Sequence, residues 1–245
     1  MHSVEFLEKL GILDNHCLFV HCIALSDADI KKLAQVGASV SLCVSSNKLM
    51  FNVTAKIRKM LKAGINLTVG TDSSASGPAN LMEEIGNLRS VYQNMYGEDL
   101  NPKKIFEMVT INAAKAFWMQ DSIGSLDEGK LGDILVLKAR KDDPYENLAG
   151  ASMRDIELLV LAGKPIFGER RFLDLIYASQ KKGQSARGKE NVPAGYSEIV
   201  VGKRPMFVIG DPAALYREIR KRTGFKKVLD FLPFEPDTQA EKKGK

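Results

Sequence analysis

The sequence predicts an α/β fold in which parallel strands alternate with helices, followed by a smaller antiparallel β region. Three apolar runs, 17–23, 38–44 and 65–70, are separated by segments with helical spacing. This alternation is typical of βαβ units, and uniformly apolar strands are typical of a parallel sheet covered on both faces. After residue 120, turn residues recur between short apolar runs, which indicates antiparallel strands.

Size and composition exclude several classes of protein. The 245 residues, 44% hydrophobic and 27% charged, suit a globular protein with a sizeable core. Three cysteines are too few for a disulfide scaffold, and their odd number favours a reducing cytoplasm. No apolar run approaches the ~20 residues of a membrane helix, and the polar N-terminus does not resemble a signal peptide. We therefore expect a cytoplasmic protein without membrane contact.

The net charge of +5 arises mainly from residues 181–245. A basic end of this kind binds nucleic acid in some proteins. Here neither aromatic–glycine interleaving nor a reader motif accompanies it, so the sequence does not favour nucleic acid as a partner.

The first region, 1–120, is predicted to contain five helices. Residues 3–13 have apolar positions at helical spacing before Gly11. Ser26 and Asp29 form an S-x-x-D start, a weak capping box, for a helix that ends at Gly37. The same periodicity predicts helices over 52–63, 79–96 and 102–117.

The second region, 121–210, is predicted to be a small β domain with hairpins at Ala162-Gly163-Lys164 and Gly202-Lys203. Its polar stretch 179–195 predicts a mobile loop. Residues 211–245 are predicted to form a C-terminal helical extension and frayed tail, with a helix over 212–224 that has Pro212 in its first turn.

Polar residues follow each of the three apolar strands: His21, Ser45-Ser46-Asn47 and Asp72. Because parallel strands place their carboxyl ends at one edge, these residues are expected to meet at a shared mouth, as in a (β/α)₈ barrel site. A core histidine and a turn aspartate are the alternative interpretations. A third interpretation makes the segment GTDSSASG an anion cradle of backbone amides in an open α/β sheet.

The cluster of His16, Cys17, His21 and Cys22 does not predict one metal site. On a strand, Cys17 and His21 share a face but lie about 13 Å apart. The spacing also lacks the paired cysteines of structural zinc sites. With only three histidines in the chain, metal and triad hypotheses are restricted.

Two segments carry a family resemblance. The first runs from VHCIALSDADIKK through SLCVSSNKLM to INLTVGTDSSAS, and the second is TINAAKAFWMQDSIGSLDEGKLGDILVLK. Together, over roughly residues 4–170, they resemble the amidohydrolase superfamily in its cytosine-deaminase-like and chlorohydrolase-like branch. The resemblance implies a partial (β/α)₈ TIM barrel, of which this chain holds the last three βα units, followed by a small antiparallel β domain.

The resemblance also implies roles for particular residues. Asp72 matches the aspartate that ligates a divalent metal, zinc or iron, and shuttles the proton of the activated water. His21 matches a histidine that contacts the hydroxide or the reacting group. Ser45, Ser46, Asn47 and Ser73 are expected to bind substrate, a heterocyclic amine or amide.

This sequence departs from the family at its metal ligands. It has no H-x-H motif, and Leu42-Cys43-Val44 stands in place of the family's HCP. One interpretation is a C-terminal piece, inactive alone and lacking the metal, that needs a complementary N-terminal half or a homo-oligomer. The other is a non-catalytic binding or assembly module.

Overall fold

The computed structural model describes residues 3–180 and 192–224. The chain divides into two compact units, one made of Met1–Lys130 with Ala139–Ser152 and the other of Leu131–Lys138 with Met153–Lys245. We call these the first and second unit. The chain therefore passes between the units after residues 130, 138 and 152, whereas the sequence-based boundary lies at residue 120. No helix within the described ranges is long and apolar enough to cross a membrane.

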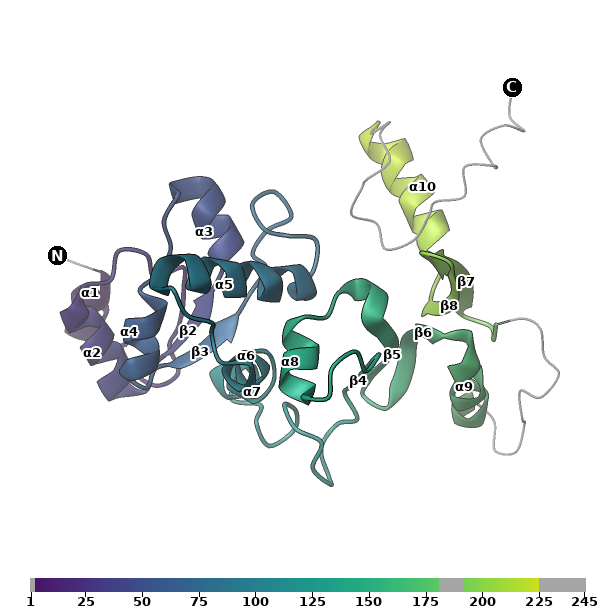
Figure 1. Ribbon diagram of the computed structural model, residues 1–245, viewed down its shortest axis with the longest axis horizontal. Coiled ribbons are helices and arrows are strands. Elements are labelled where there is room, and N and C mark those ends of the chain that lie inside the picture. The colour runs from purple at the N-terminus through teal and green to yellow at the C-terminus, as the bar shows by residue number, and fades with distance from the viewer. Residues whose placement is uncertain (1–2, 181–191, 225–245) are drawn as a thin grey trace. The chain divides into compact units, whose positions relative to one another are not determined.

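The first unit contains a three-stranded sheet and its helices (Figure 1). Its elements are α1 (Ser3–Lys9), β1 (Leu18–Val20), α2 (Asp27–Val36), β2 (Ser39–Leu42), α3 (Val44–Phe51), α4 (Ile57–Lys62), β3 (Asn66–Val69), α5 (Leu81–Tyr96), α6 (Pro102–Val109), α7 (Ile111–Ala116) and α8 (Pro144–Ala149).

The three strands are parallel in the order β1-β2-β3, which confirms the predicted parallel sheet. Phe19 aligns with Val40, and Val40 aligns with Leu67. Each strand is shorter than the apolar run that predicts it, because the ends of each run turn into the loops. The core of this unit combines strand residues with helix residues that are almost fully buried: Leu33, Val40, Leu42, Ile57, Met60, Leu67, Ile85, Leu88 and Ile105.

Helix α2 confirms the predicted capping box. The Ser26 hydroxyl accepts a hydrogen bond from the Asp29 N–H (3.1 Å), and Asp29 Oδ2 accepts one from the Ser26 N–H (2.9 Å). Gly37 ends the helix at φ 74°, a left-handed conformation that costs glycine least.

The helix predicted over 52–63 is partly wrong. Only α4, Ile57–Lys62, is helical there, and the preceding helix α3, Val44–Phe51, is not predicted. Asn52 in the left-handed conformation (φ 53°) ends α3. Serine and asparagine are weak helix formers, so the start of α3 depends on a partner far away in the sequence, described below.

The helix predicted over 102–117 is interrupted. It forms as α6 and α7, with Thr110 between them at φ −127° and ψ −100°. The Thr110 hydroxyl donates to the Phe106 carbonyl at 2.6 Å, an alternative to the regular helical hydrogen bonds.

The second unit is built on a five-stranded antiparallel sheet in the order β4-β5-β6-β8-β7, which confirms the predicted β structure. Its elements are β4 (Ile134–Leu137), η1 (Met153–Asp155), β5 (Ile156–Leu161), β6 (Lys164–Glu169), η2 (Arg170–Phe172), α9 (Leu173–Gln180), β7 (Tyr196–Val201), β8 (Arg204–Ile209) and α10 (Pro212–Thr223). Both predicted hairpins and the helix after Pro212 are present.

Close packing in this sheet explains one glycine. A Cβ at Gly168 would lie 2.8 Å from Leu158 Cδ1 and 2.9 Å from Phe207 Cζ, so a larger residue there would require these buried side chains to shift. The predicted loop 179–195 overlaps the end of α9, and residues 181–191 lie outside the described residues. The tail beyond Gly224 also lies outside them.

Replacing Ser26 by alanine removes the capping box of α2. We expect Ser26→Ala to lower the free energy of unfolding by about 1 kcal/mol, measured by urea denaturation. Lys31→Ala on the exposed part of the same helix is the control, with an expected change within about 0.5 kcal/mol. Equal losses in both variants would contradict the role of the cap.

Candidate active site

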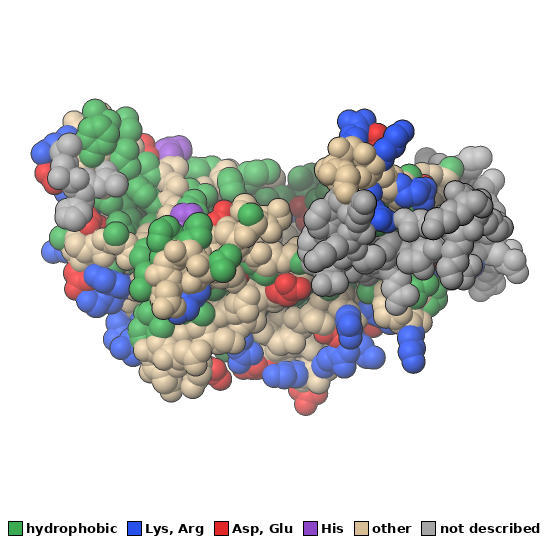
Figure 2. Space-filling view, turned by 90° about the horizontal axis from the view of Figure 1, so that it is seen from above, with side chains coloured by type: hydrophobic (Ala, Val, Ile, Leu, Met, Phe, Trp, Pro, Cys, Tyr) green, Lys and Arg blue, Asp and Glu red, His purple; other side chains and the backbone are tan. Residues whose placement is uncertain are grey.

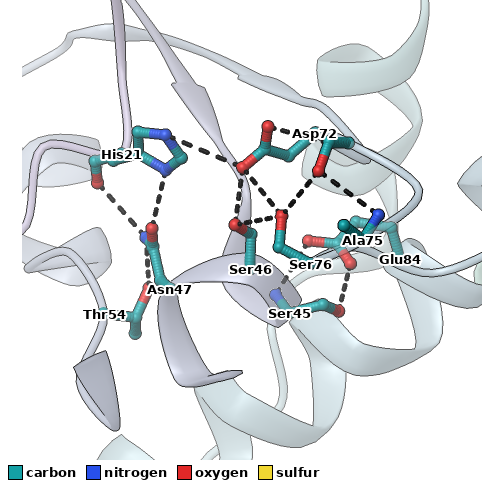
Figure 3. A network of polar contacts seen from close by, with 10 residues as sticks. His21, Ser45, Ser46, Asn47, Thr54, Asp72, Ala75, Ser76 and Glu84 are labelled. Atoms are coloured by element: carbon teal, nitrogen blue, oxygen red, sulfur yellow. Dashed lines mark hydrogen bonds and ion pairs between the residues drawn. The ribbon is translucent and has the colours of Figure 1, made fainter. Parts of the chain in front are cut away.

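The polar residues that follow the three strands meet at one edge of the parallel sheet (Figure 3). His21 follows β1 directly, and Asp72 lies three residues beyond the last residue of β3. The middle strand, β2, is followed by Cys43 and then by α3, whose first turn contains Ser46 and Asn47. The parallel register thus brings residues from three separate segments into one network.

His21 and Asp72 face each other across the mouth of this edge. His21 Nε2 lies 3.7 Å from Asp72 Oδ2, and the two side chains are 35% and 27% exposed. Figure 2 shows histidine side chains at the surface among hydrophobic ones. Both residues have positive φ, 68° and 60°, a conformation that is uncommon outside glycine and often found at functional sites.

Asp72 is held by hydroxyl and amide donors. The Ser46 hydroxyl donates to Asp72 Oδ2 at 2.5 Å, the Ser73 N–H donates to Oδ1 at 2.8 Å, and the Ser76 hydroxyl lies 3.4 Å from Oδ2. The hydrogen bond from Ser46 is the main reason that the pKa of Asp72 lies below the usual range for aspartate. The carboxyl is therefore ionised at neutral pH.

His21 is held on its other side by Asn47, which is fully buried. Asn47 Oδ1 lies 2.8 Å from His21 Nδ1, and Asn47 Nδ2 donates to the His21 carbonyl at 3.3 Å. The same amide nitrogen donates to Thr54 Oγ1 at 3.2 Å. The imidazole is thus oriented by two groups from α3 and the loop after it.

The start of α3 is capped by a carboxylate from α5. No side chain at Cys43 caps this helix. The fully buried Glu84 instead accepts hydrogen bonds from the Ser45 N–H at 3.1 Å and from the Ser45 hydroxyl. A carboxylate at a helix N-terminus satisfies free N–H groups and the helix dipole. Burial nevertheless raises the pKa of Glu84 above the usual range for glutamate, and the hydrogen bonds from Ser45 oppose that rise.

The structure places the predicted site residues in different roles. His21, Ser46, Asn47 and Asp72 share one network, and Ser73 joins it through its backbone N–H. The Ser45 hydroxyl is turned to Glu84 and accepts from Asn87 Nδ2 at 2.8 Å.

Sequence reasoning missed Thr54, Ser76 and Glu84. For Glu84 a signal exists, since it lies four residues before Leu88 on the apolar face of α5. An acid on an apolar helix face needs a buried partner. Thr54 and Ser76 lie in loops without such a signal.

Several amides of the GTDSSASG segment, the alternative anion cradle, donate within the loop itself. The N–H groups of Ser76 and Gly77 donate to the Ser73 carbonyl, at 3.1 and 2.8 Å. The Ala75 N–H donates to the Ser73 hydroxyl at 3.3 Å. Together with the Ser73 N–H on Asp72, these bonds occupy four of the loop's N–H groups.

The described residues do not by themselves fit a metal centre. No three of their histidine, cysteine, aspartate or glutamate side chains come together in a way that could hold an ion, whereas catalytic zinc takes three protein ligands. His16 stacks on Trp118, with 4.1 Å between ring centroids. Burial raises the pKa of Cys22 to about 12, which disfavours the thiolate that a metal binds.

A cavity of about 750 Å³ lies at the opposite ends of the strands. Ser39 and Asn66, the first residues of β2 and β3, line it together with Asn112 and Trp118. None of the predicted site residues lines this cavity. The candidate active site is therefore the open mouth at the carboxyl ends of the strands.

The fold is that of a known class of hydrolase. Residues 1–166 match the model of the amidohydrolase family. The chain belongs to the amidohydrolase family.

Curated relatives are deaminases and triazine hydrolases. The chain is 36% identical over 135 residues to a 5-methylthioadenosine/S-adenosylhomocysteine deaminase from Archaeoglobus fulgidus, an alignment that covers 54% of this chain and 32% of the relative. It is 32% identical to an S-triazine hydrolase from Gordonia rubripertincta, over 61% of this chain and 32% of the relative.

Solved structures agree with the fold. The zinc complex of the atrazine chlorohydrolase TrzN from Arthrobacter aurescens superposes with a TM-score of 0.61 at 25% identity, covering 68% of this chain and 39% of that one. A zinc-bound adenosine deaminase from Xanthomonas campestris gives a TM-score of 0.61 at 24% identity, covering 66% and 39%. The chain thus spans about a third to two fifths of the length of these proteins.

The raised pKa of Glu84 makes a prediction about stability and pH. Because the folded-state pKa lies above the ordinary value of 4.5, this carboxyl stabilises most below about pH 4.5, and its contribution declines as pH rises through the folded-state pKa. Glu84→Gln removes that decline and keeps an oxygen for the Ser45 N–H. We expect its stability relative to the native protein to increase between about pH 4 and pH 7, measured by urea denaturation at each pH.

Asp72→Asn is the control with the opposite sign. The pKa of Asp72 is lowered, so its contribution is present above about pH 4 and is lost as pH falls through the folded-state value. The relative stability of Asp72→Asn should therefore change little between about pH 4 and pH 7 and should increase as pH falls below about 4. A rise for Asp72→Asn between about pH 4 and pH 7 that equals the rise for Glu84→Gln would refute the assignment.

Proposed function

We propose that the chain forms the C-terminal part of a metal-dependent amidohydrolase that hydrolyses non-peptide C–N bonds, or C–Cl bonds, of small molecules. In this proposal β1, β2 and β3 belong to the last three βα units of a (β/α)₈ barrel, and the second unit is the small β domain that follows it. The pairing of His21 with Asp72, 3.7 Å apart at the carboxyl ends of parallel strands, carries the proposal, because barrel enzymes have their active sites there.

The substrate that we propose is a heterocyclic amine or amide. The relatives are named for adenosine derivatives and triazines, which supports small nitrogen heterocycles. Deamination of such a ring breaks a C–N bond, forms a C–O bond to the oxygen of water and releases ammonia. The site must therefore take a proton from water and return one to the leaving nitrogen.

Asp72 and His21 suit these tasks. Asp72 is ionised, and its carboxylate would hold zinc or iron together with ligands from outside this sequence. When bound, such a metal supplies an acidified water. The Asp72 carboxylate can accept that water's proton. The imidazole of His21, one-third exposed at the mouth, would contact the reacting group.

The chain alone is proposed to be inactive. Asp72 is the metal ligand proposed in this chain, and even together with His21 it falls short of the three protein ligands that are typical of catalytic zinc. The alignments with relatives cover 32% to 45% of their length. We infer that a complementary N-terminal part supplies the remaining ligands. The three free cysteines, Cys17, Cys22 and Cys43, support a cytoplasmic location.

Metal content and turnover of purified residues 1–245 test whether the chain alone is inactive. We expect less than one zinc or iron per chain and no hydrolysis of methylthioadenosine, S-adenosylhomocysteine or a chlorinated triazine. Turnover by the isolated chain that Asp72→Asn abolishes would show that the remaining ligands are not needed.

A chimera tests whether a complementary N-terminal part restores metal binding and activity. The part of the Archaeoglobus deaminase that precedes its matched region is joined to this chain. We expect one equivalent of metal and deamination that falls at least about 100-fold in Asp72→Asn. The control Lys31→Ala should retain activity. A folded, metal-loaded chimera without turnover of any of these substrates would refute the proposed activity.

A further inference from the structure

Asn47 is the most completely enclosed polar residue of the His21 side of the network. Its side chain is fully buried, so it does not reach a substrate in the open mouth. All three of its polar contacts are internal, to the His21 ring, to the His21 carbonyl and to Thr54 (Figure 3). A role through His21, rather than through substrate, is therefore indicated.

The chemistry of its partners fixes the orientation of the Asn47 amide. The His21 carbonyl can only accept a hydrogen bond, so the amide group 3.3 Å from it must be the NH₂. The second hydrogen of that NH₂ points to Thr54 Oγ1 at 3.2 Å. The opposite orientation would set two carbonyl oxygens against each other. Asn47 Oδ1 therefore faces His21 Nδ1, at 2.8 Å.

This orientation decides which ring nitrogen of His21 carries the proton. Asn47 Oδ1 has no hydrogen to donate, so Nδ1 must be the donor. In the neutral imidazole the other nitrogen, Nε2, then has a free lone pair. Nε2 lies 3.7 Å from Asp72 Oδ2, and the carboxylate is also an acceptor. His21 Nε2 and Asp72 Oδ2 are thus two hydrogen-bond acceptors on either side of one gap. This arrangement suits a molecule, such as water or an amine, that donates a hydrogen bond to each of them.

We propose that Asn47 is a positioning residue that holds neutral His21 in its Nδ1–H tautomer, so that Nε2 accepts a hydrogen bond from the water or leaving amine in front of Asp72. Thr54 acts one step further away, because it occupies the second hydrogen of the Asn47 amide. The hydrogen bond to a reacting group rests on the proposed function. The tautomer itself does not, since it follows from contacts within this chain.

The tautomer is measured directly by ¹⁵N NMR of the histidine ring nitrogens in residues 1–245 at about pH 9, where imidazoles are neutral. His21→Gln identifies the His21 signals among the three histidines. We expect the chemical shift of a protonated nitrogen for Nδ1 and of an unprotonated nitrogen for Nε2. A protonated Nε2 in the native chain would overturn the inference, whatever the chain's activity.

Variants separate Asn47 from a general structural effect. Asn47→Leu and Thr54→Val should move His21 toward a mixture of tautomers, whereas Thr54→Ser should restore the native spectrum. Lys31→Ala is the control, since Lys31 is exposed on α2 and outside this network; its His21 spectrum should not change. If Asn47→Leu does not fold, the spectrum of the native chain and the comparison of Thr54→Val with Thr54→Ser still test the His21 tautomer.

The catalytic consequence is tested in the completed enzyme described above. Thr54→Val should lower kcat by about 10-fold to 100-fold, as loss of a group that orients a site residue does, with KM within about twofold. Thr54→Ser should recover most of it. An unchanged kcat together with an altered tautomer would refute the catalytic role. An inactive chimera with the expected native tautomer would refute the proposed function and leave the tautomer inference standing.

Discussion

The hydrogen bonds from the start of α3 to the buried carboxylate of Glu84 hold the candidate site together. Without a capping side chain of its own, α3 begins where it does because α5 brings an acceptor to its first N–H groups. That starting point determines which way Ser46 and Asn47 point. Ser46 then orients Asp72, and Asn47 orients His21. One buried carboxylate therefore sets the positions of two side chains that it does not touch.

Backbone strain accompanies this arrangement. His21, Cys22 and Asp72 all have positive φ, and such conformations cost free energy for residues other than glycine unless the surroundings enforce them. The enforcing contacts are visible: the His21 N–H donates to the Ser41 carbonyl of β2, and both oxygens of Asp72 accept hydrogen bonds. The strain turns both side chains toward the mouth, where they are partly exposed. A regular continuation of the strands would send alternate residues to opposite faces.

The sequence was informative where a local pattern and the final structure agree. Apolar runs identified all three parallel strands, and the carboxyl-end rule placed His21 and Asp72 at one edge. The prediction from sequence failed at α3 because two serines and an asparagine in this helix have weak helical preference. The group that caps the helix also lies 39 residues away, at Glu84. The break at Thr110 was invisible for a related reason: the periodicity of apolar residues continues across it while the backbone does not. A long-range hydrogen bond to Glu84 decides the first place, and a side-chain bond from Thr110 to the Phe106 carbonyl accompanies the second.

The same contacts explain how the two facing side chains of the strand-end site can each be ordered by this chain's own residues. Three donors from Ser46, Ser73 and Ser76 surround Asp72, so its negative charge is stabilised by the protein itself. His21 is oriented independently, through Asn47 and Thr54. Each half of the pair is thus fixed by neighbours behind it, and the gap between Nε2 and Oδ2 is left facing outward. Orientation of both side chains is therefore built into this chain, and in the proposed function the gap between them would receive positive charge and further ligands.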